Sequence, residues 1–170
     1  MVELLHIRHS NLPLIPYLQM SLEESVMPNR IKQITASQAA DVMPDLVRLF
    51  NQLSPGAAPL KSEQVKLSLQ SSNVIVLGAF TDGKLVGTAT LVLAPLLNKT
   101  IGFIESVVVD EAYRGQGFGV RLMRTILELA EQRGLSACNL TSSPHRTKAN
   151  ELYQELGFIL RETNVYRYRF

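Results

Sequence analysis

Tryptophan is missing from the sequence, and cysteine occurs only once, as Cys138, in 170 residues. A single cysteine cannot form an internal disulfide, and no group of cysteine and histidine residues has the spacing of a metal site. We therefore expect neither a disulfide-bonded scaffold nor a bound metal. A protein without disulfides suits a reducing compartment, so the cytoplasm is the expected location.

The net charge of the chain is also small, and its apolar runs are short. Charged residues make up 19% of the chain, and 17 basic against 15 acidic side chains leave +2. Nucleic acid is not an expected partner, because proteins that bind its phosphates are usually strongly basic. Residues 1–20 carry charged side chains and prolines, unlike a signal peptide. Since no segment reaches the ~18 consecutive apolar residues of a membrane span, we expect no membrane partner.

Apolar residues, by contrast, make up 46% of the chain, which is enough for one packed core. The length fits one domain, since domains commonly have ~100 to 200 residues. Residues 1–29 show no regular hydrophobic period and contain Pro13, Pro16 and Pro28, so we treat them as an extension of unknown role. Residues 30–170 are expected to form the domain.

The hydrophobic pattern of residues 30–170 predicts a mixed α/β fold of the α+β type. Because proline is tolerated only in a first helical turn, Pro44 makes Asp41 an alternative to Ser37 as the cap of the first helix. Asp82-Gly83 is typical of a hairpin turn between two strands. Together the elements give a mixed sheet of about six to seven strands flanked by about four helices. The predicted strands are 30–35, 73–81, 84–93, 101–109, 137–141, 158–161 and 165–170, and the helices end near 54, 69, 133 and 156.

A glycine-rich segment follows the run Val107-Val108-Val109, which is typical of a buried strand at the centre of a sheet. Where a strand turns into a helix, unpaired main-chain N–H groups can bind an anion, and glycines let a phosphate approach them. The segment lacks the Gly-Lys-Ser/Thr of a P-loop, and Val120 stands where a dinucleotide fingerprint needs its third glycine. An anion site and a purely structural turn remain open.

Two motifs lie in and after this segment. Arg114, Gly117 and Gly119 fit the pattern Arg/Gln-x-x-Gly-x-Gly/Ala after a strand ending in Val-Val-Asp. The second motif, Ala-x-x-Leu-Tyr-x-x-x-Gly-Phe, is matched from Ala149 to Phe158. In this order and on these predicted elements, they resemble the GNAT superfamily of N-acetyltransferases over residues 30–170. The resemblance implies a single-domain GNAT fold with splayed central strands and acetyl-coenzyme A (acetyl-CoA) as cosubstrate.

The resemblance also implies specific roles for residues of this chain. The strand of Val107, Val108 and Val109 would lie along the pantetheine arm, with Val107 and Val109 pairing through their backbones. Tyr153 would protonate the departing thiolate, although a tyrosine on an amphipathic helix can also be an ordinary core residue. The main chain that would hold the pyrophosphate is that of Arg114, Gly115, Gln116, Gly117, Phe118, Gly119 and Val120, and Asn150 would be a further cofactor-binding residue.

An alkylamine has a pKa of about 10 and must lose a proton before it attacks a thioester. Glu105 is the candidate base, because it precedes Val107 by two residues on the central strand and its family counterpart is a common general base; it could also be an exposed strand carboxylate. The main-chain N–H of Val107 would stabilise the oxyanion. Cys138 is interpreted as a small buried side chain, so direct transfer in a ternary complex is expected over an acetyl-cysteine intermediate.

The acceptor is expected to be a primary amine, with the small-molecule classes open. Residues 102–110, 113–115 and 166–170 resemble glucosamine-6-phosphate N-acetyltransferases in particular, except that Ser106 stands where those enzymes usually have Asp. Arg146, Arg167 and Arg169 could hold an anionic acceptor or simply keep the surface soluble. Alternatives are another acyl-CoA donor, a protein lysine or N-terminus as acceptor, and a non-catalytic acyl-CoA-binding module. A homodimer is a further expectation that the resemblance leaves open.

Overall fold

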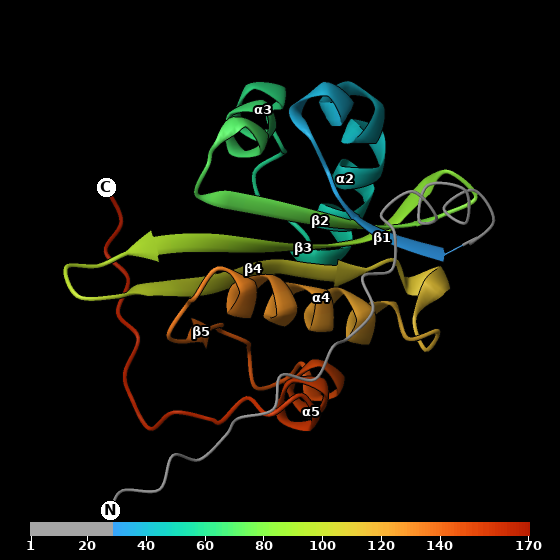
Figure 1. Ribbon diagram of the computed structural model, residues 1–170. Coiled ribbons are helices and arrows are strands. Elements are labelled where there is room, and N and C mark those ends of the chain that lie inside the picture. Colours follow the sequence, from blue (N-terminus) through green and yellow to red (C-terminus); the bar gives the residue numbers. More distant parts are fainter. Residues whose placement is uncertain (1–28) are drawn as a thin grey trace, which may run out of the picture.

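A computed structural model describes residues 29–170 as a five-stranded sheet with helices on both faces (Figure 1). The order along the sheet follows the sequence, β1-β2-β3-β4-β5. Helices α2 and α3 cover one face, and α4 and α5 lie on the other. The predicted extension of residues 1–29 lies, apart from Asn29, outside the described residues. The mixed α/β fold predicted from the sequence is confirmed.

Four of the strands form an antiparallel meander. They are β1 (Asn29–Gln33), β2 (Val74–Thr81), β3 (Lys84–Pro95) and β4 (Thr100–Val109), and the short β5 (Cys138–Asn139) runs parallel to β4. Between β2 and β3, Asp82 and Gly83 have φ angles of 49° and 77°. Two residues with positive φ form the tight turn expected for an Asp-Gly hairpin.

The helices begin and end close to the predicted positions. They are the 3-10 helix η1 (Ala36–Gln38), α2 (Ala39–Leu53), α3 (Ser62–Gln70), the 3-10 helix η2 (Glu111–Tyr113), α4 (Phe118–Gln132) and α5 (Thr147–Glu155). The predicted cap of the first helix is wrong. Thr35 and Gln38 form a capping box before η1, and Pro44 lies inside α2, because η1 continues directly into α2 and moves the start of the helix towards the N-terminus.

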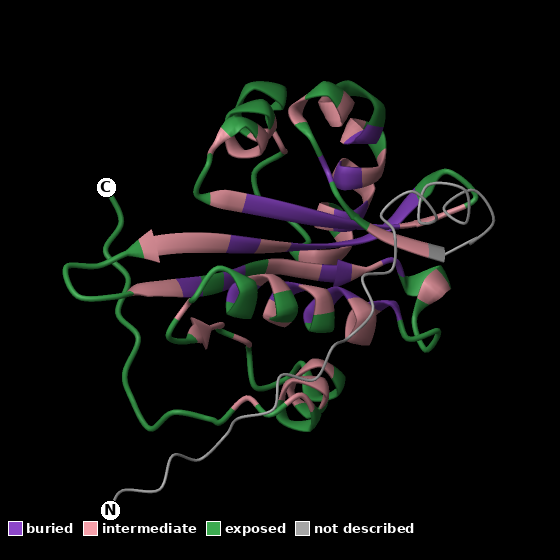
Figure 2. Cartoon of the chain, viewed as in Figure 1, coloured by how far each residue is buried: buried purple, intermediate pink, exposed green. Residues whose placement is uncertain are grey.

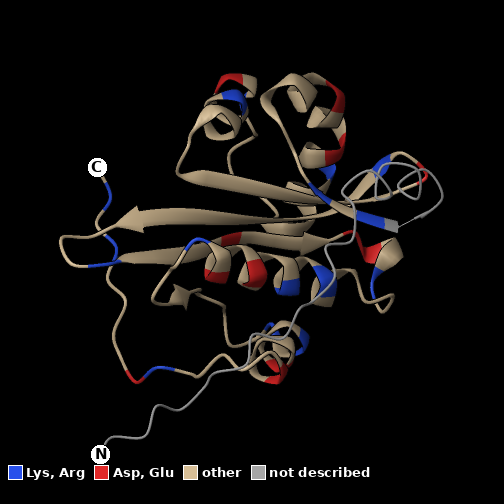
Figure 3. Cartoon of the chain, in the orientation of Figure 1, with Lys and Arg blue, Asp and Glu red and all other residues tan. Residues whose placement is uncertain are grey.

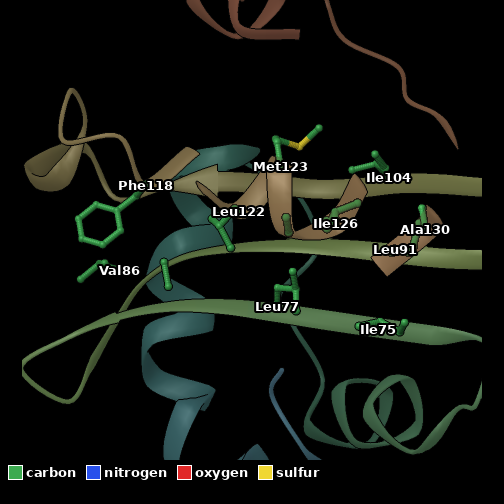
Figure 4. Close-up of a cluster of buried hydrophobic side chains, with 12 residues drawn as sticks. Ile75, Leu77, Val86, Leu91, Ile104, Phe118, Leu122, Met123, Ile126 and Ala130 are labelled. Carbon is green, nitrogen blue, oxygen red and sulfur yellow. The ribbon is translucent and has the colours of Figure 1, made fainter. Parts of the chain in front are cut away.

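Buried side chains form one cluster on each face of the sheet (Figure 2). Figure 4 shows the larger cluster, in which Leu122, Met123 and Ile126 of α4 are buried together with side chains of β2, β3 and β4. On the other face, α2 contributes Val42, Leu46 and Leu49 to the second cluster. The helices α2 and α4 therefore pack against opposite faces of the sheet that contains β4. No helix in the range 29–170 is long and apolar enough to cross a bilayer.

Two details of the predicted sheet are wrong. The strand at 137–141 has only two residues in β5, and the predicted strands 158–161 and 165–170 are not strands in the described chain. A strand requires a hydrogen-bonded neighbour, and none of the described strands pairs with these segments. Several of their apolar side chains are consequently exposed, among them Ile159, Tyr166 and Phe170. The sheet thus has five strands, and β3, not β4, is its central strand.

Candidate active site

A gap in the sheet lies between β4 and β5. The two strands pair only at Gly102 with Cys138 and Phe103 with Asn139. Beyond these pairs the strands separate, so no described strand lies beside residues 104–109 of β4 on this side. We call this side of residues 104–109 the open edge. A cleft of about 730 Å³ occupies the gap and is lined by residues 104–107 on one side and 140–144 on the other.

A β-bulge in β4 determines which main-chain groups face this gap. The pairing with β3 shifts register between Thr88 and Thr90, and opposite this shift Ser106 has a φ of 56°, which is rare for a residue with a side chain. Before the bulge, the N–H of Gly102 bonds towards the β5 side, to Ala137 (2.8 Å). After it, the N–H of Asp110 bonds towards β3, to Val86 (2.8 Å).

The bulge reverses the side to which the main-chain N–H groups point, and this decides which residues of the open edge face the gap. Strand residues alternate in the side to which their N–H and C=O point. Because the N–H of Asp110 points towards β3, the N–H and C=O groups of Val109 and Val107 point towards the gap. The carbonyl of Val109 indeed accepts a hydrogen bond from Nε of Arg114 (3.2 Å) and not from β3. Apart from that carbonyl, the main-chain groups of Val107 and Val109 that face the gap have no partner among residues 29–170, so an extended ligand could pair with them.

The open edge leads into residues 110–117, which we call the glycine turn. Gly115 and Gly117 have φ angles of 76° and 77°, in the left-handed region that favours glycine. Gly117 is the N-cap of α4 and has no side chain with which to cap the helix. The N–H groups of the first helical residues, Phe118, Gly119 and Val120, therefore have no intrahelical partner and can bind an anion.

Arg121 provides a second sign of an anion at this turn. Its Nη1 donates to the carbonyl of Gln116 (3.2 Å), and its guanidinium lies 4.5 Å from the centre of the Phe118 ring. Its Nε and Nη2 are buried and have no hydrogen-bond partner in the part of the chain that the structure describes. Buried donors are normally satisfied, and a cation at a helix N-terminus is unfavourable on its own. A diphosphate would supply the missing acceptors and the opposite charge, so the residues present fit such a ligand.

Sequence reasoning missed Arg121, although a signal was present. A cationic side chain four residues after the capping glycine reaches back over the first helical turn, since helical side chains point towards the N-terminus. The other residues of the predicted anion site, Arg114 to Val120, are all placed at the glycine turn or in the first turn of α4.

The two predicted catalytic side chains line the same cleft. Glu105 is exposed on β4, and Tyr153 is half-buried on α5, where its ring packs edge-to-face against Phe158 with centroids 6.0 Å apart. Burial raises the pKa of the Tyr153 phenol above its usual value, and the nearby Arg146 partly opposes this shift. Tyr153 therefore keeps its proton at neutral pH, as a proton donor must.

The opposite wall of the cleft comes from α2, the loop after it, and two arginines. Arg146 and Arg167 both line the cleft, and Nη2 of Arg146 donates to the carbonyl of Leu53 (2.8 Å), which joins α5 to the end of α2. The residues that α2 and its loop contribute include Val47, Phe50, Asn51, Leu53, Ser54 and Leu60. No motif marks these positions, so this wall could not be predicted from the sequence. The helices α2, α3, α4 and α5 each carry charges of both signs, whereas β1 carries only Arg30 and Lys32 (Figure 3).

The contacts of Asn150 and Cys138 show where these two residues lie relative to the cleft. The amide of Asn150 donates to the carbonyls of Ser143 (3.1 Å) and Pro144 (3.5 Å), so it fixes the loop that lines the cleft. Cys138 lies on β5, with its sulfur against Gly102, outside the residues that line the cleft. Burial raises the pKa of the Cys138 thiol, which keeps it in the less nucleophilic protonated form.

The model of the acetyltransferase (GNAT) family matches residues 43–158, and the chain belongs to this family. It is thus an acyltransferase by class, as the two motifs predicted. Glucosamine 6-phosphate N-acetyltransferase 1 of Oryza sativa subsp. japonica is 32% identical over 78% of this chain and 83% of its own length. A glucosamine 6-phosphate N-acetyltransferase of Trypanosoma brucei brucei is 36% identical, over 49% of this chain and 56% of that protein.

Solved structures show the same fold at lower identity. An aminoglycoside acetyltransferase from an uncultured soil metagenomic sample superposes with a TM-score of 0.74, at 20% identity, over 84% of this chain and 96% of that one. An acetyltransferase of Trypanosoma brucei has a TM-score of 0.69 at 24% identity, over 83% and 99% of the two chains. The predicted GNAT fold is confirmed.

Proposed function

We propose that this protein transfers the acetyl group of acetyl-CoA to a primary amine of a small molecule, by direct attack within a ternary complex. The observation that carries this proposal is a single cleft in which Glu105 and Tyr153 lie beside an unpaired strand edge. Residues 30–170 would form the catalytic domain. No covalent protein intermediate is needed, because the protonated Cys138 thiol is outside the cleft.

The donor substrate would be held at two places, the start of α4 and the open edge of β4. The diphosphate binds the N–H groups at the start of α4, with Arg121 as an additional partner. The pantetheine arm then runs along β4 and takes the place of a neighbouring strand, through the main-chain groups of Val107 and Val109. This arrangement brings the thioester to the level of the bulge, next to Glu105.

The chemistry at that point requires the attacking nitrogen to lose two protons, the departing sulfur to gain one, and one charged oxygen to be stabilised. Glu105, directly or through water, removes the proton of the ammonium group, so that the amine attacks the thioester carbonyl. The N–H of Val107 donates to the carbonyl oxygen as negative charge develops on it. The C–S bond then breaks as Tyr153 donates its proton to the departing sulfur, and the nitrogen, now bonded to the acetyl carbon, gives up its second proton, which restores the Tyr153 phenol.

Tyr153→Phe is expected to lower kcat by about tenfold. General acids commonly contribute ~100-fold, but a thiol with a pKa of ~8.5 leaves fairly well without help, so a smaller effect is expected here. The pKa of Tyr153 is raised by burial, so ionisation of this residue should reduce activity only above pH 10. Steady-state rates of both proteins from pH 6 to 10 measure the effect. Tyr168→Phe, at an exposed tyrosine, is the matched control; equal rates for all three proteins would remove Tyr153 from the mechanism.

The acceptor side favours an anionic amine. Arg146 and Arg167 face the same cleft, and arginine pairs well with phosphate. Two relatives are named as glucosamine 6-phosphate N-acetyltransferases, whereas Ser106 departs from the residue expected for that group. We therefore place glucosamine 6-phosphate first among the acceptors and an aminoglycoside second.

Thiol release from acetyl-CoA tests the proposed function. The protein is assayed with glucosamine 6-phosphate, unphosphorylated glucosamine, an aminoglycoside, a polyamine and a lysine-containing peptide. Release that depends on an amine, and is at least about tenfold faster with the phosphorylated sugar than with glucosamine, is expected if two arginines bind the phosphate. Tight CoA binding without turnover on any amine would instead support a non-catalytic acyl-CoA-binding module.

A further inference from the structure

Three polar residues lie along one side of α2, on the face of the sheet opposite to α4 (Figure 1). Asp45, Arg48 and Gln52 follow each other at intervals of three and four residues, so they share one face of the helix. The mechanism proposed above uses none of them. All three contact main-chain or side-chain groups far away in the sequence, at the start of β3 and at the glycine turn.

The first contacts fix the start of β3. Nη2 of Arg48 donates to the carbonyl of Leu85 (2.8 Å) and to Oδ1 of Asp45 (2.8 Å). Oδ2 of Asp45 accepts from the N–H of Leu85 (3.0 Å), so both main-chain groups of this residue are bound by α2. Because the carbonyl of the next residue, Val86, accepts from the N–H of Asp110, this part of β3 lies directly beside the beginning of the glycine turn.

The second contacts reach the glycine turn itself. Nη1 of Arg48 pairs with Oδ2 of Asp110, whose side chain is only 7% exposed. The other carboxylate oxygen of Asp110 accepts from the N–H of Ala112 (3.0 Å) and so caps η2. One residue along, the N–H of Glu111 donates to Oε1 of Gln52 (3.0 Å). Two side chains of α2 thus hold the turn at the point where β4 ends.

We propose that Arg48 and Gln52 are positioning residues, which hold the glycine turn in the conformation that binds the diphosphate of acetyl-CoA. This inference deepens the proposed function and rests on it for the identity of the ligand. Main-chain N–H groups bind an anion well only if they already converge, because an ordered turn loses less conformational entropy on binding. Arg48 provides this order by neutralising and orienting buried Asp110, and Gln52 by fixing the next peptide group.

Hydrogen exchange and CoA affinity together test the positioning role. In Arg48→Met, the amides of residues 111–114 should exchange at least about tenfold faster, because the acceptors of two of them are no longer held. The dissociation constant for CoA should rise about tenfold, with kcat at saturating acetyl-CoA within about twofold of wild type. Arg124→Met, at an exposed arginine of α4 for which no contact is described, removes the same charge and should change none of these values.

A substitution of Gln52 gives the same test with less risk to the fold, because the ion pair between Arg48 and Asp110 stays intact. Gln52→Met removes the acceptor of the Glu111 N–H and should raise exchange and the CoA dissociation constant by about threefold to fivefold, whereas Gln52→Glu keeps an acceptor and should restore both. Wild-type exchange and affinity in Gln52→Met would overturn the proposal, even if Arg48→Met fails to fold. If the wild-type protein binds no CoA, the proposed function fails, and the exchange of residues 111–114 alone decides the positioning role.

Discussion

Gly117→Val is expected to raise the dissociation constant for CoA by at least about 30-fold. Position 117 has a φ of 77°, and a residue with a Cβ in this region costs ~1–2 kcal/mol, more when it is β-branched. A Cβ would also lie 3.3 Å from Nη1 of Arg121, which must then move. The turn would leave the binding conformation, and a cost of about 2 kcal/mol corresponds to this factor in affinity. Isothermal titration with CoA measures it.

The hairpin between β2 and β3 provides the matched control. Gly83 also has a φ of 77°, and a Cβ there would meet no atom within 4 Å. Gly83→Val therefore introduces a similar backbone strain away from the cleft, and it should lower the melting temperature without changing CoA affinity. If Gly117→Val bound CoA as tightly as Gly83→Val, the glycine turn would not be the diphosphate site.

Glu105→Gln is expected to lower kcat by about 100-fold to 1000-fold near neutral pH, with CoA affinity unchanged. Glutamine has nearly the same shape but accepts no proton, so only acceptors that are already neutral can react. Because the neutral fraction of an amine with a pKa of about 10 rises tenfold per pH unit, the residual rate should climb steadily from pH 7 to 9. The pH dependence of kcat with the best acceptor of the panel measures this.

A second carboxylate controls for loss of charge. Glu128→Gln, on the exposed side of α4, should keep the wild-type rate at every pH. Should Glu105→Gln behave like this control across the whole range, the proton would be removed by another group, and Glu105 would be an ordinary exposed strand carboxylate.

The parts of the fold that could be predicted from the sequence are those set by neighbouring residues. Asp82 and Gly83 determine their hairpin because the positive φ angles are a property of the dipeptide itself. The turn at Gly117 and the helix after it follow in the same way from local pattern. The predicted C-terminal strands at 158–161 and 165–170 had an equally suitable pattern, but a strand also needs a partner, which the pattern cannot provide.

The same reasoning explains what could be predicted of the site. Tyr153 is predicted from its place in a motif and Glu105 from its position two residues before Val107 together with the family resemblance, and the structure brings both to one cleft. Their catalytic roles stay predictions. Arg48 and Asp110, by contrast, lie 62 positions apart in the numbering, and no periodicity connects them. Contacts of this kind depend on how helices and sheet pack, so a single sequence contains no local signal for them.

The short pairing of β4 with β5 has a consequence for the stability of the protein against unfolding and proteolysis. Within residues 29–170, two residue pairs form the only ladder between the sheet and the segment that follows α4. A ligand lying in the gap would add hydrogen bonds between the two strands. Any molecule that binds only the native state stabilises that state in proportion to the logarithm of the molecule's concentration. The supply of acetyl-CoA would then set how long the protein resists unfolding and proteases, as well as how fast it works.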